Sequence, residues 1–173
     1  MILIFKPKVV LGLAALISLS CCGYSLVGRG TALPPDVRSI RIPVFANATG
    51  QPEVETVVTG RIKDKFIQDG RLSVVEGPAA DSALHGVIEK YELKPLSYDS
   101  QNNVTQYLAE IVVSVTHSMA DSGRVLARRK VDTKEVFKVD ASVAGSESQR
   151  MAALNRAADA AAISILSLVV EAF

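Results

Sequence analysis

Residues 104–119 alternate between apolar and polar side chains over sixteen positions, and this pattern is the strongest constraint on the fold. The apolar residues at odd-numbered positions are Tyr107, Ala109, Ile111, Val113, Val115 and Met119. A period of two places these side chains on one face of a β-strand, and His117 falls on the same side. At about 3.3 Å per residue such a strand is about 50 Å long, so part of it must project or bend.

Asp121-Ser122-Gly123 follows this strand and is a typical hairpin turn sequence. Residues 124–139 are therefore predicted to return as the partner strand. Three shorter strands are predicted at residues 37–45, 71–76 and 83–93. Pro43 places the first of them at a strand end or a sheet edge, because proline has no N–H for a ladder hydrogen bond. Residues 94–103 are polar and rich in turn formers, which predicts a connection.

Two segments show helical periodicity. The first is predicted to begin at Pro52 and to end at Gly70, and its apolar positions are Val54, Val57, Val58, Ile62 and Phe66. Gly60 weakens this helix by about 1 kcal/mol relative to Ala, unless close packing requires the missing side chain.

The second predicted helix closes the chain from about Ser146. Its apolar stripe consists of Met151, Leu154, Ala158, Ala161, Ile165 and Leu168. Residues 160–170 are apolar almost all round. This part is either buried against the sheet, which we favour, or forms a surface for a partner.

The element order β-α-β-β-β-β-α predicts an α/β (α+β) two-layer sandwich. Both helices are expected on one face of a mixed sheet of four to five strands.

The N-terminus has the layout of an export signal. Lys6 and Lys8 precede an apolar run from Val9 to Leu19, which is too short to span a membrane. The run ends in Leu19-Ser20-Cys21-Cys22, the pattern of a bacterial lipoprotein signal. We predict a signal peptide over 1–21, acylation of Cys22 with Cys21 as the alternative, a lipidated tether over 22–36, and one globular domain over 37–173. Ordinary soluble secretion is the competing interpretation.

The composition excludes several functional classes. Removal of the leader takes away two lysines from 19 basic and 18 acidic residues, so the mature protein is nearly neutral. A nearly neutral chain is unlike a nucleic-acid-binding protein, whose affinity comes from a basic surface.

The two cysteines both lie at the leader junction, which leaves none for a disulfide or a metal site. His85 and His117 lie on separate predicted strands without a catalytic motif, so we predict no catalytic residues, no metal and no cofactor.

One basic cluster stands out in the returning strand. It consists of Arg124, Arg128, Arg129, Lys130 and Lys134. Guanidinium and ammonium groups bind phosphate oxygens, so this cluster is a candidate for contacts with phosphorylated sugars or lipid head groups. The alternative is a solvated strand whose charges prevent edge-to-edge pairing. Alternation of side chains also means that Arg128, Arg129 and Lys130 cannot all share one face.

Short motifs along the whole mature chain resemble those of one family in their order and spacing. They are Cys22-Gly23-Tyr24 with Leu26, Leu33-Pro34, Ile42-Pro43-Val44-Phe45 with Asn47 and Thr49, Asp81 and Gly86, the Tyr98 loop, the 121–123 hairpin, and the closing helix. The chain resembles the lipopolysaccharide-assembly lipoproteins, the E component of the lipopolysaccharide transport system. The double cysteine departs from the usual pattern, in which a small residue precedes the acylated cysteine.

The resemblance implies a non-enzymatic outer-membrane lipoprotein. Such a protein plugs and helps to assemble a β-barrel lipopolysaccharide translocon, the D component, and contacts lipopolysaccharide. Its N-terminal lipid lies in the inner leaflet of the outer membrane. Gly23 after Cys22 agrees with that location, because an Asp at this position commonly retains lipoproteins at the inner membrane. The resemblance assigns no binding residue, so the basic cluster remains the lipopolysaccharide candidate on chemical grounds.

Two other functions remain open from the sequence. The first is a free-standing, lipid-anchored periplasmic binding module for a small ligand or an envelope polymer. The second is a lipid-anchored hydrolase that uses a pair of carboxylates.

Overall fold

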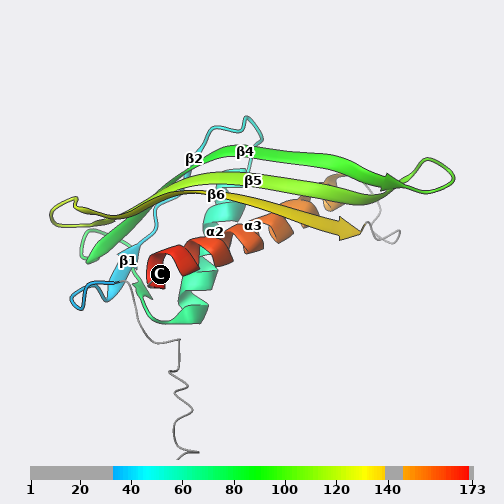
Figure 1. Ribbon diagram of the computed structural model, residues 1–173. Helices are drawn as coiled ribbons and strands as arrows, with labels where there is room; N and C mark the ends of the chain where they lie inside the picture. Colours follow the sequence, from blue (N-terminus) through cyan, green and yellow to red (C-terminus); the bar gives the residue numbers. More distant parts are fainter. Residues whose placement is uncertain (1–32, 139–145, 172–173) are drawn as a thin grey trace, which may run out of the picture. The chain divides into compact units, whose positions relative to one another are not determined.

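A computed structural model describes residues 33–138 and 146–171. These residues form a six-stranded mixed sheet with two helices on one of its faces (Figure 1). The strands are β1 (Ser39–Arg41), β2 (Ala46–Asn47), β3 (Ser73–Val74), β4 (Ser82–Tyr98), β5 (Val104–Met119) and β6 (Val125–Lys138). The helices are α2 (Val54–Asp69) and α3 (Ser146–Val170). The predicted α+β two-layer architecture is confirmed.

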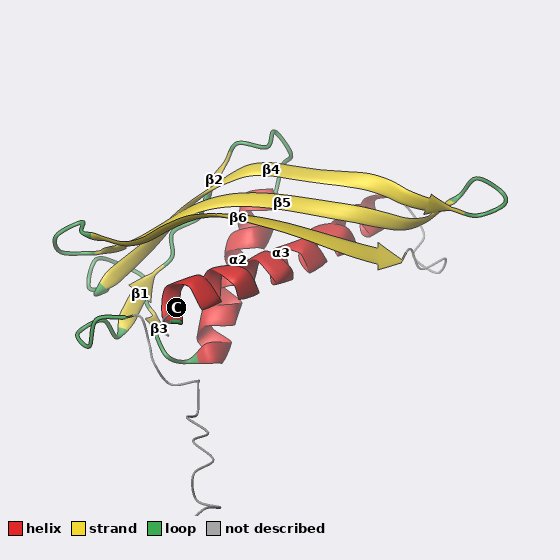
Figure 2. Cartoon of the chain, in the orientation of Figure 1, coloured by secondary structure: helices red, strands yellow, loops and turns green. Residues whose placement is uncertain are grey.

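The sheet has the order β3-β1-β4-β5-β6, and β2 pairs with β4 beyond the end of β1. The short strands pair in parallel, whereas β4, β5 and β6 form a long antiparallel meander (Figure 2). Strand β5 has the predicted limits. Its odd-numbered residues Ala109, Ile111, Val113 and Val115 are fully buried under the helices. The even-numbered residues of β5 therefore point to the opposite face of the sheet.

The first predicted strand is divided in two. Strand β1 pairs with the start of β4, and β2 pairs with β4 again at Val87 and Ile88. Pro43 lies between them and cannot donate a ladder hydrogen bond, so pairing stops there. This division is why the sheet has six strands instead of four to five.

Strand β4 is longer than predicted. It continues to Tyr98, so only residues 99–103 form the connection to β5. Asp99 shapes this turn by accepting hydrogen bonds from the backbone N–H groups of Gln101 and Asn103, both at 2.8 Å. No residue from Lys94 to Leu108 is buried, so this end of the hairpin projects beyond the core. The sequence does not predict that residues 94–98 pair with β5, because residues of these types are common in turns.

Helix α2 begins at Val54, two residues later than predicted, because Glu53 adopts a left-handed conformation with φ of 68°. Gly70 ends the helix, with its N–H bonded to the carbonyl of Phe66. A Cβ at Gly60 would have no neighbour within 4 Å, so packing does not require the glycine.

Helix α3 buries most of its predicted stripe. Leu154, Ala158, Ala161 and Ile165 are inaccessible to solvent, and Met151 and Leu168 are partly buried. Burial therefore accounts for most of the apolar C-terminal half, although Ile163 is 53% exposed. By length and hydropathy alone, residues 147–170 could cross a membrane, but half of the most apolar 18-residue stretch of this helix is buried in the protein. A core helix passes the same test.

Several predictions concern residues outside the described part of the chain. They are the signal peptide over 1–21, the acylation of Cys22 or Cys21, and most of the tether over 22–36.

Candidate functional site

The outer face of the sheet, opposite α2 and α3, is not covered by any helix that the structure describes (Figure 1). We use the name outer face for the side chains of β4, β5 and β6 on this side. In β5 it consists of the even-numbered residues from Gln106 to Ser118. Their cross-strand partners in β6 are Lys138, Val136, Lys134, Asp132, Lys130, Arg128 and Val125. This surface carries most of the charged residues of the three long strands.

Glu110 lies at the centre of the outer face. Its carboxylate bonds to Lys90 of β4 at 2.7 Å and lies 3.6 Å from Lys134 of β6. Lys90 also contacts Glu92 at 3.0 Å, and Glu92 contacts Lys94 at 3.0 Å. The Glu110 residue is only 8% exposed although no helix lies over it, because its own neighbours cover it. These contacts join all three strands in one ion-pair network.

The network shifts the ionisation of its members. The hydrogen bond from Lys90 lowers the pKa of Glu110 below its usual value. The same contact raises the pKa of Lys90. Lys94 lowers the pKa of Glu92 in the same way. Each shift favours the charged form, so the network stays ionised at neutral pH.

A second group of contacts lies closer to the β5–β6 turn. The Lys130 ammonium group and the Ser114 hydroxyl both bond to the carboxylate of Glu89. Glu89 lies at an irregularity in the β4–β5 register, between Ile88 and Lys90. A β-bulge of this kind redirects a side chain, here toward the middle strand. Lys130 consequently contributes little free positive charge.

One cross-strand row of the outer face combines a histidine, a threonine and an arginine. His85 of β4 lies opposite Thr116 of β5, and Thr116 lies opposite Arg128 of β6. Arg128 Nε donates a hydrogen bond to Thr116 Oγ1 at 3.3 Å. His85 and Arg128 are exposed.

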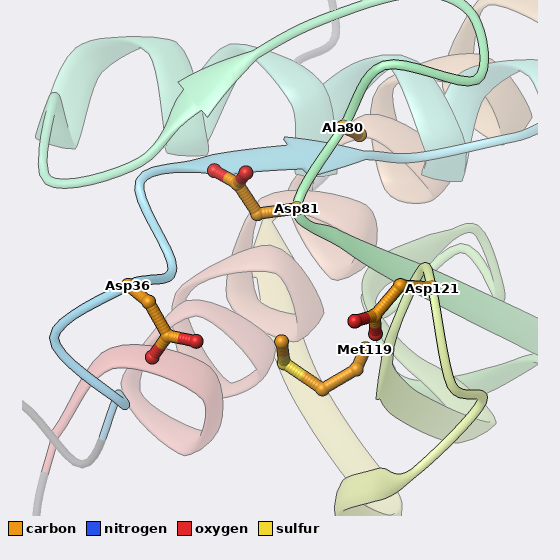
Figure 3. Close-up of a pocket in the computed structure, with 5 residues that line it drawn as sticks. All are labelled: Asp36, Ala80, Asp81, Met119 and Asp121. Atoms are coloured by element: carbon orange, nitrogen blue, oxygen red, sulfur yellow. The ribbon is translucent and has the colours of Figure 1, made fainter.

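A pocket of about 270 Å³ lies where β1, β4 and the β5–β6 turn meet (Figure 3). Asp36, Asp81 and Asp121 line it together with Ala80 and Met119. Asp81 accepts hydrogen bonds from the N–H groups of Arg38 and Ser39, and from the Ser39 hydroxyl at 2.7 Å. The Ser39 contact is the main cause of the lowered pKa of Asp81. Asp81 therefore serves to hold β1 against the start of β4.

Comparison with known families decides the relationship of this chain. The family model LptE, described as lipopolysaccharide-assembly, matches residues 37–169. The chain belongs to the LptE family. This membership associates it with lipopolysaccharide assembly in the bacterial envelope. A comparison with curated protein sequences gave no significant match.

Solved structures share the fold of this LptE family member at low sequence identity. Lipoprotein B of Nitrosomonas europaea has a TM-score of 0.51 and 16% identity, over 82% of this chain and 88% of that one. The PelC dodecamer of Paraburkholderia phytofirmans has a TM-score of 0.52 and 14% identity, over 83% and 98%. A hypothetical protein of Chlamydia trachomatis has a TM-score of 0.52 and 8% identity, over 77% and 98%. At these identities the likeness concerns the fold alone.

The basic cluster predicted from sequence does not form one patch in this LptE family member. Arg128, Lys130 and Lys134 belong to the outer face, whereas Arg129 lies opposite Val115 and therefore points to the helix side. Arg124 precedes β6 in the turn and is exposed. Lys130 and Lys134 are paired with carboxylates. Within the described residues, Arg124, Arg128 and Arg129 form no ion pair.

Sequence reasoning missed the residues that share the outer face with these cations. Lys90, Glu92 and Lys94 come from β4, and Glu110 comes from β5. The alternation in β5 places Glu110 on the polar face, but its partners depend on the register between strands. The bulge near Glu89 changes that register, and no local pattern predicts it.

The two histidines lie in different environments. His85 is exposed on the outer face, while His117 is 1% exposed and its Nε2 has no hydrogen-bond partner. Burial lowers the pKa of His117 to about 4, so the ring is neutral at pH 7. The described residues contain no cluster of three or more His, Cys, Asp or Glu side chains suited to a metal ion.

Proposed function

We propose that this LptE family member is a non-enzymatic, lipid-anchored outer-membrane protein. It occupies the interior of a β-barrel lipopolysaccharide translocon, helps that barrel to assemble, and assists the delivery of lipopolysaccharide to the outer leaflet. The family match over residues 37–169 supports the general role in lipopolysaccharide assembly. The lipoprotein-type leader supports the anchor, with Cys22 as the acylated residue and Cys21 as the alternative.

The observation that carries the barrel proposal is the charge-compensated outer face. The interior of a membrane β-barrel is polar, so a protein inside it needs a hydrogen-bonding surface with little net charge. The ion pairs across the three strands balance three lysines with three carboxylates before any partner is present; these residues are Lys90, Lys94, Lys134, Glu92, Glu110 and Asp132. A polar wall can approach such a surface without leaving an unpaired charge, which would be costly to desolvate.

The same face suits contact with a phosphorylated amphiphile. Arg128 has no carboxylate partner among the described residues of this face. The side chains of three valines, Val87, Val125 and Val136, are each more than 40% exposed. Phosphate groups would contact the cations, and acyl chains would contact the valines. We therefore propose the outer face as the side on which lipopolysaccharide meets the protein, with Arg124 in the adjoining β5–β6 turn, whereas Arg129 points to the helix side.

Affinity purification from detergent-solubilised envelopes tests the barrel proposal. We expect the tagged protein to co-elute with a large β-barrel protein at about one to one. A Cys22→Ser variant separates anchoring from binding, because loss of the lipid should reduce membrane association without removing the barrel contact. Elution of the lipidated protein alone from well-solubilised membranes would contradict the proposal and favour a free-standing binding module.

A further inference from the structure

We propose that His85, Thr116 and Arg128 form a binding site for a phosphate group on the outer face. The site would take a phosphomonoester or pyrophosphate group carried by lipopolysaccharide. This inference rests on the proposed contact with lipopolysaccharide and assigns that contact to one position. His85 and Thr116 are not part of the basic cluster that the sequence indicates.

The sheet register brings the three residues together. Thr116 is directly opposite His85 on one side and Arg128 on the other. Directly opposed residues in antiparallel strands have Cβ atoms about 5 Å apart. Val115 and His117 on either side of Thr116 are buried toward the helices, so Thr116 and its two partners face outward. The row therefore presents three polar side chains within the reach of one phosphate group.

The charges around the row distinguish it from the central ion-pair network of the outer face. Lys90, Lys94 and Lys134 each have a carboxylate partner. Arg128 has only the neutral Thr116 hydroxyl as its side-chain partner among the described residues. Its guanidinium group therefore retains donors for an anion, and a guanidinium fork binds phosphate oxygens in a bidentate manner.

The carboxylate nearest to the site along β4 is already paired with other residues and does not neutralise Arg128. Glu89 is the nearest acidic residue along β4, and its carboxylate is occupied by Lys130 and Ser114. The Lys130 contact is the main cause of the lowered pKa of Glu89. Glu89 is thereby directed toward Lys130, and Lys130 shields the charge from an anion at Arg128. His85 adds a ring nitrogen donor and Thr116 adds a hydroxyl donor to the same phosphate.

Binding of lipopolysaccharide to the purified full-length protein tests the site. We expect Arg128→Gln to weaken binding about fivefold and His85→Gln to weaken it by a smaller factor, as for exposed charge contacts. Arg128→Lys should recover only part of the affinity, because it retains the charge and loses the fork. Arg156→Gln is the matched control, because it removes an exposed arginine from α3 on the other side of the sheet.

Two further measurements test whether the phosphate groups of lipopolysaccharide are what the site binds. Dephosphorylated lipopolysaccharide should bind wild type and Arg128→Gln equally. Inorganic pyrophosphate, followed by NMR, should perturb the signals of His85, Thr116 and Arg128. Perturbation by pyrophosphate without any effect of the variants on lipopolysaccharide binding would overturn the assignment to lipopolysaccharide.

The test separates this inference from the function on which it rests. If wild type binds lipopolysaccharide and Arg128→Gln binds it equally well, the site is wrong and the proposed contact stands. If wild type does not bind lipopolysaccharide at all, the proposed contact itself is wrong.

Discussion

The ring of Phe45 occupies the space that a side chain at Gly86 would fill. A Cβ added to Gly86 would overlap the ring carbons of Phe45. Phe45 is 2% exposed, and its N–H donates a hydrogen bond to Thr59 of α2 at 3.0 Å. Gly86 therefore allows the segment between β1 and β2 to lie against β4, and Phe45 connects this segment to α2.

Gly86→Ala should destabilise the protein. The added methyl group forces the Phe45 ring to move within a packed core, which typically costs about 1–3 kcal/mol. Urea unfolding measures the change in free energy. Phe45→Leu combined with Gly86→Ala should recover part of the loss, because the smaller side chain makes room. An unchanged unfolding midpoint for Gly86→Ala would show that the ring moves freely.

Gly60→Ala should have the opposite effect. Nothing lies within 4 Å of a Cβ at Gly60, and the residue is inside α2. Alanine has a higher helix propensity than glycine, so we expect a gain of about 1 kcal/mol in the free energy of unfolding. The same urea experiment measures this gain. A loss of stability would mean that α2 and its neighbours approach more closely than the structure indicates.

Glu110→Gln should lower stability and strengthen the binding of anions. The substitution removes the carboxylate that neutralises Lys90 and Lys134, so the outer face becomes more positive. Heparin retention at low salt measures the charge effect, and the added retention should disappear as salt increases. Glu171→Gln, which removes an exposed carboxylate after α3, is the control and should leave retention by the outer face unchanged.

Acid should weaken the contact between Glu110 and Lys90. Because the pKa of folded Glu110 is below the unfolded value of about 4.5, its contribution to stability is complete above that value. This contribution is lost as the pH falls through the lower folded pKa. Urea unfolding of wild type and Glu110→Gln should therefore converge in acid, and a constant difference down to about pH 2 would contradict the role of the ionised carboxylate.

His117 should make the protein less stable in mildly acidic solution. Its pKa is about 4 in the folded state against 6.5 when exposed, so the unfolded chain takes up the proton first. The stability associated with neutral His117 is complete above pH 6.5 and is lost between pH 6.5 and 4, to a total of about 3 kcal/mol.

His117→Leu removes this proton uptake. The difference in stability between wild type and His117→Leu should grow as the pH falls from about 7 to about 4, while shared carboxylate effects cancel. His85→Gln is the matched control for the loss of a histidine, because His85 is exposed on the outer face and not buried in the core. Parallel pH profiles for wild type and His117→Leu would show that the buried ring does not control acid stability.

The sequence by itself determined the elements with strong periodicity. The alternation in 104–119 specified β5 and its buried face, and the stripe containing Leu154, Ala158 and Ile165 specified the buried side of α3. Both patterns are local, because a strand or a helix repeats its geometry every few residues. The two-layer fold follows from the need to bury these apolar faces against each other.

Tertiary structure alone decided which charges meet. Glu110 lies between Lys90 and Lys134, and Arg128 lies beside Thr116, because three strands align in one register. The division of the first strand at Pro43 and the packing of Phe45 on Gly86 also depend on pairing with β4. A shift of one residue in the register of a strand would move every side chain of that strand to the other face of the sheet. Register is set by contacts between distant segments, so a candidate site built across strands emerges only when the sheet is assembled.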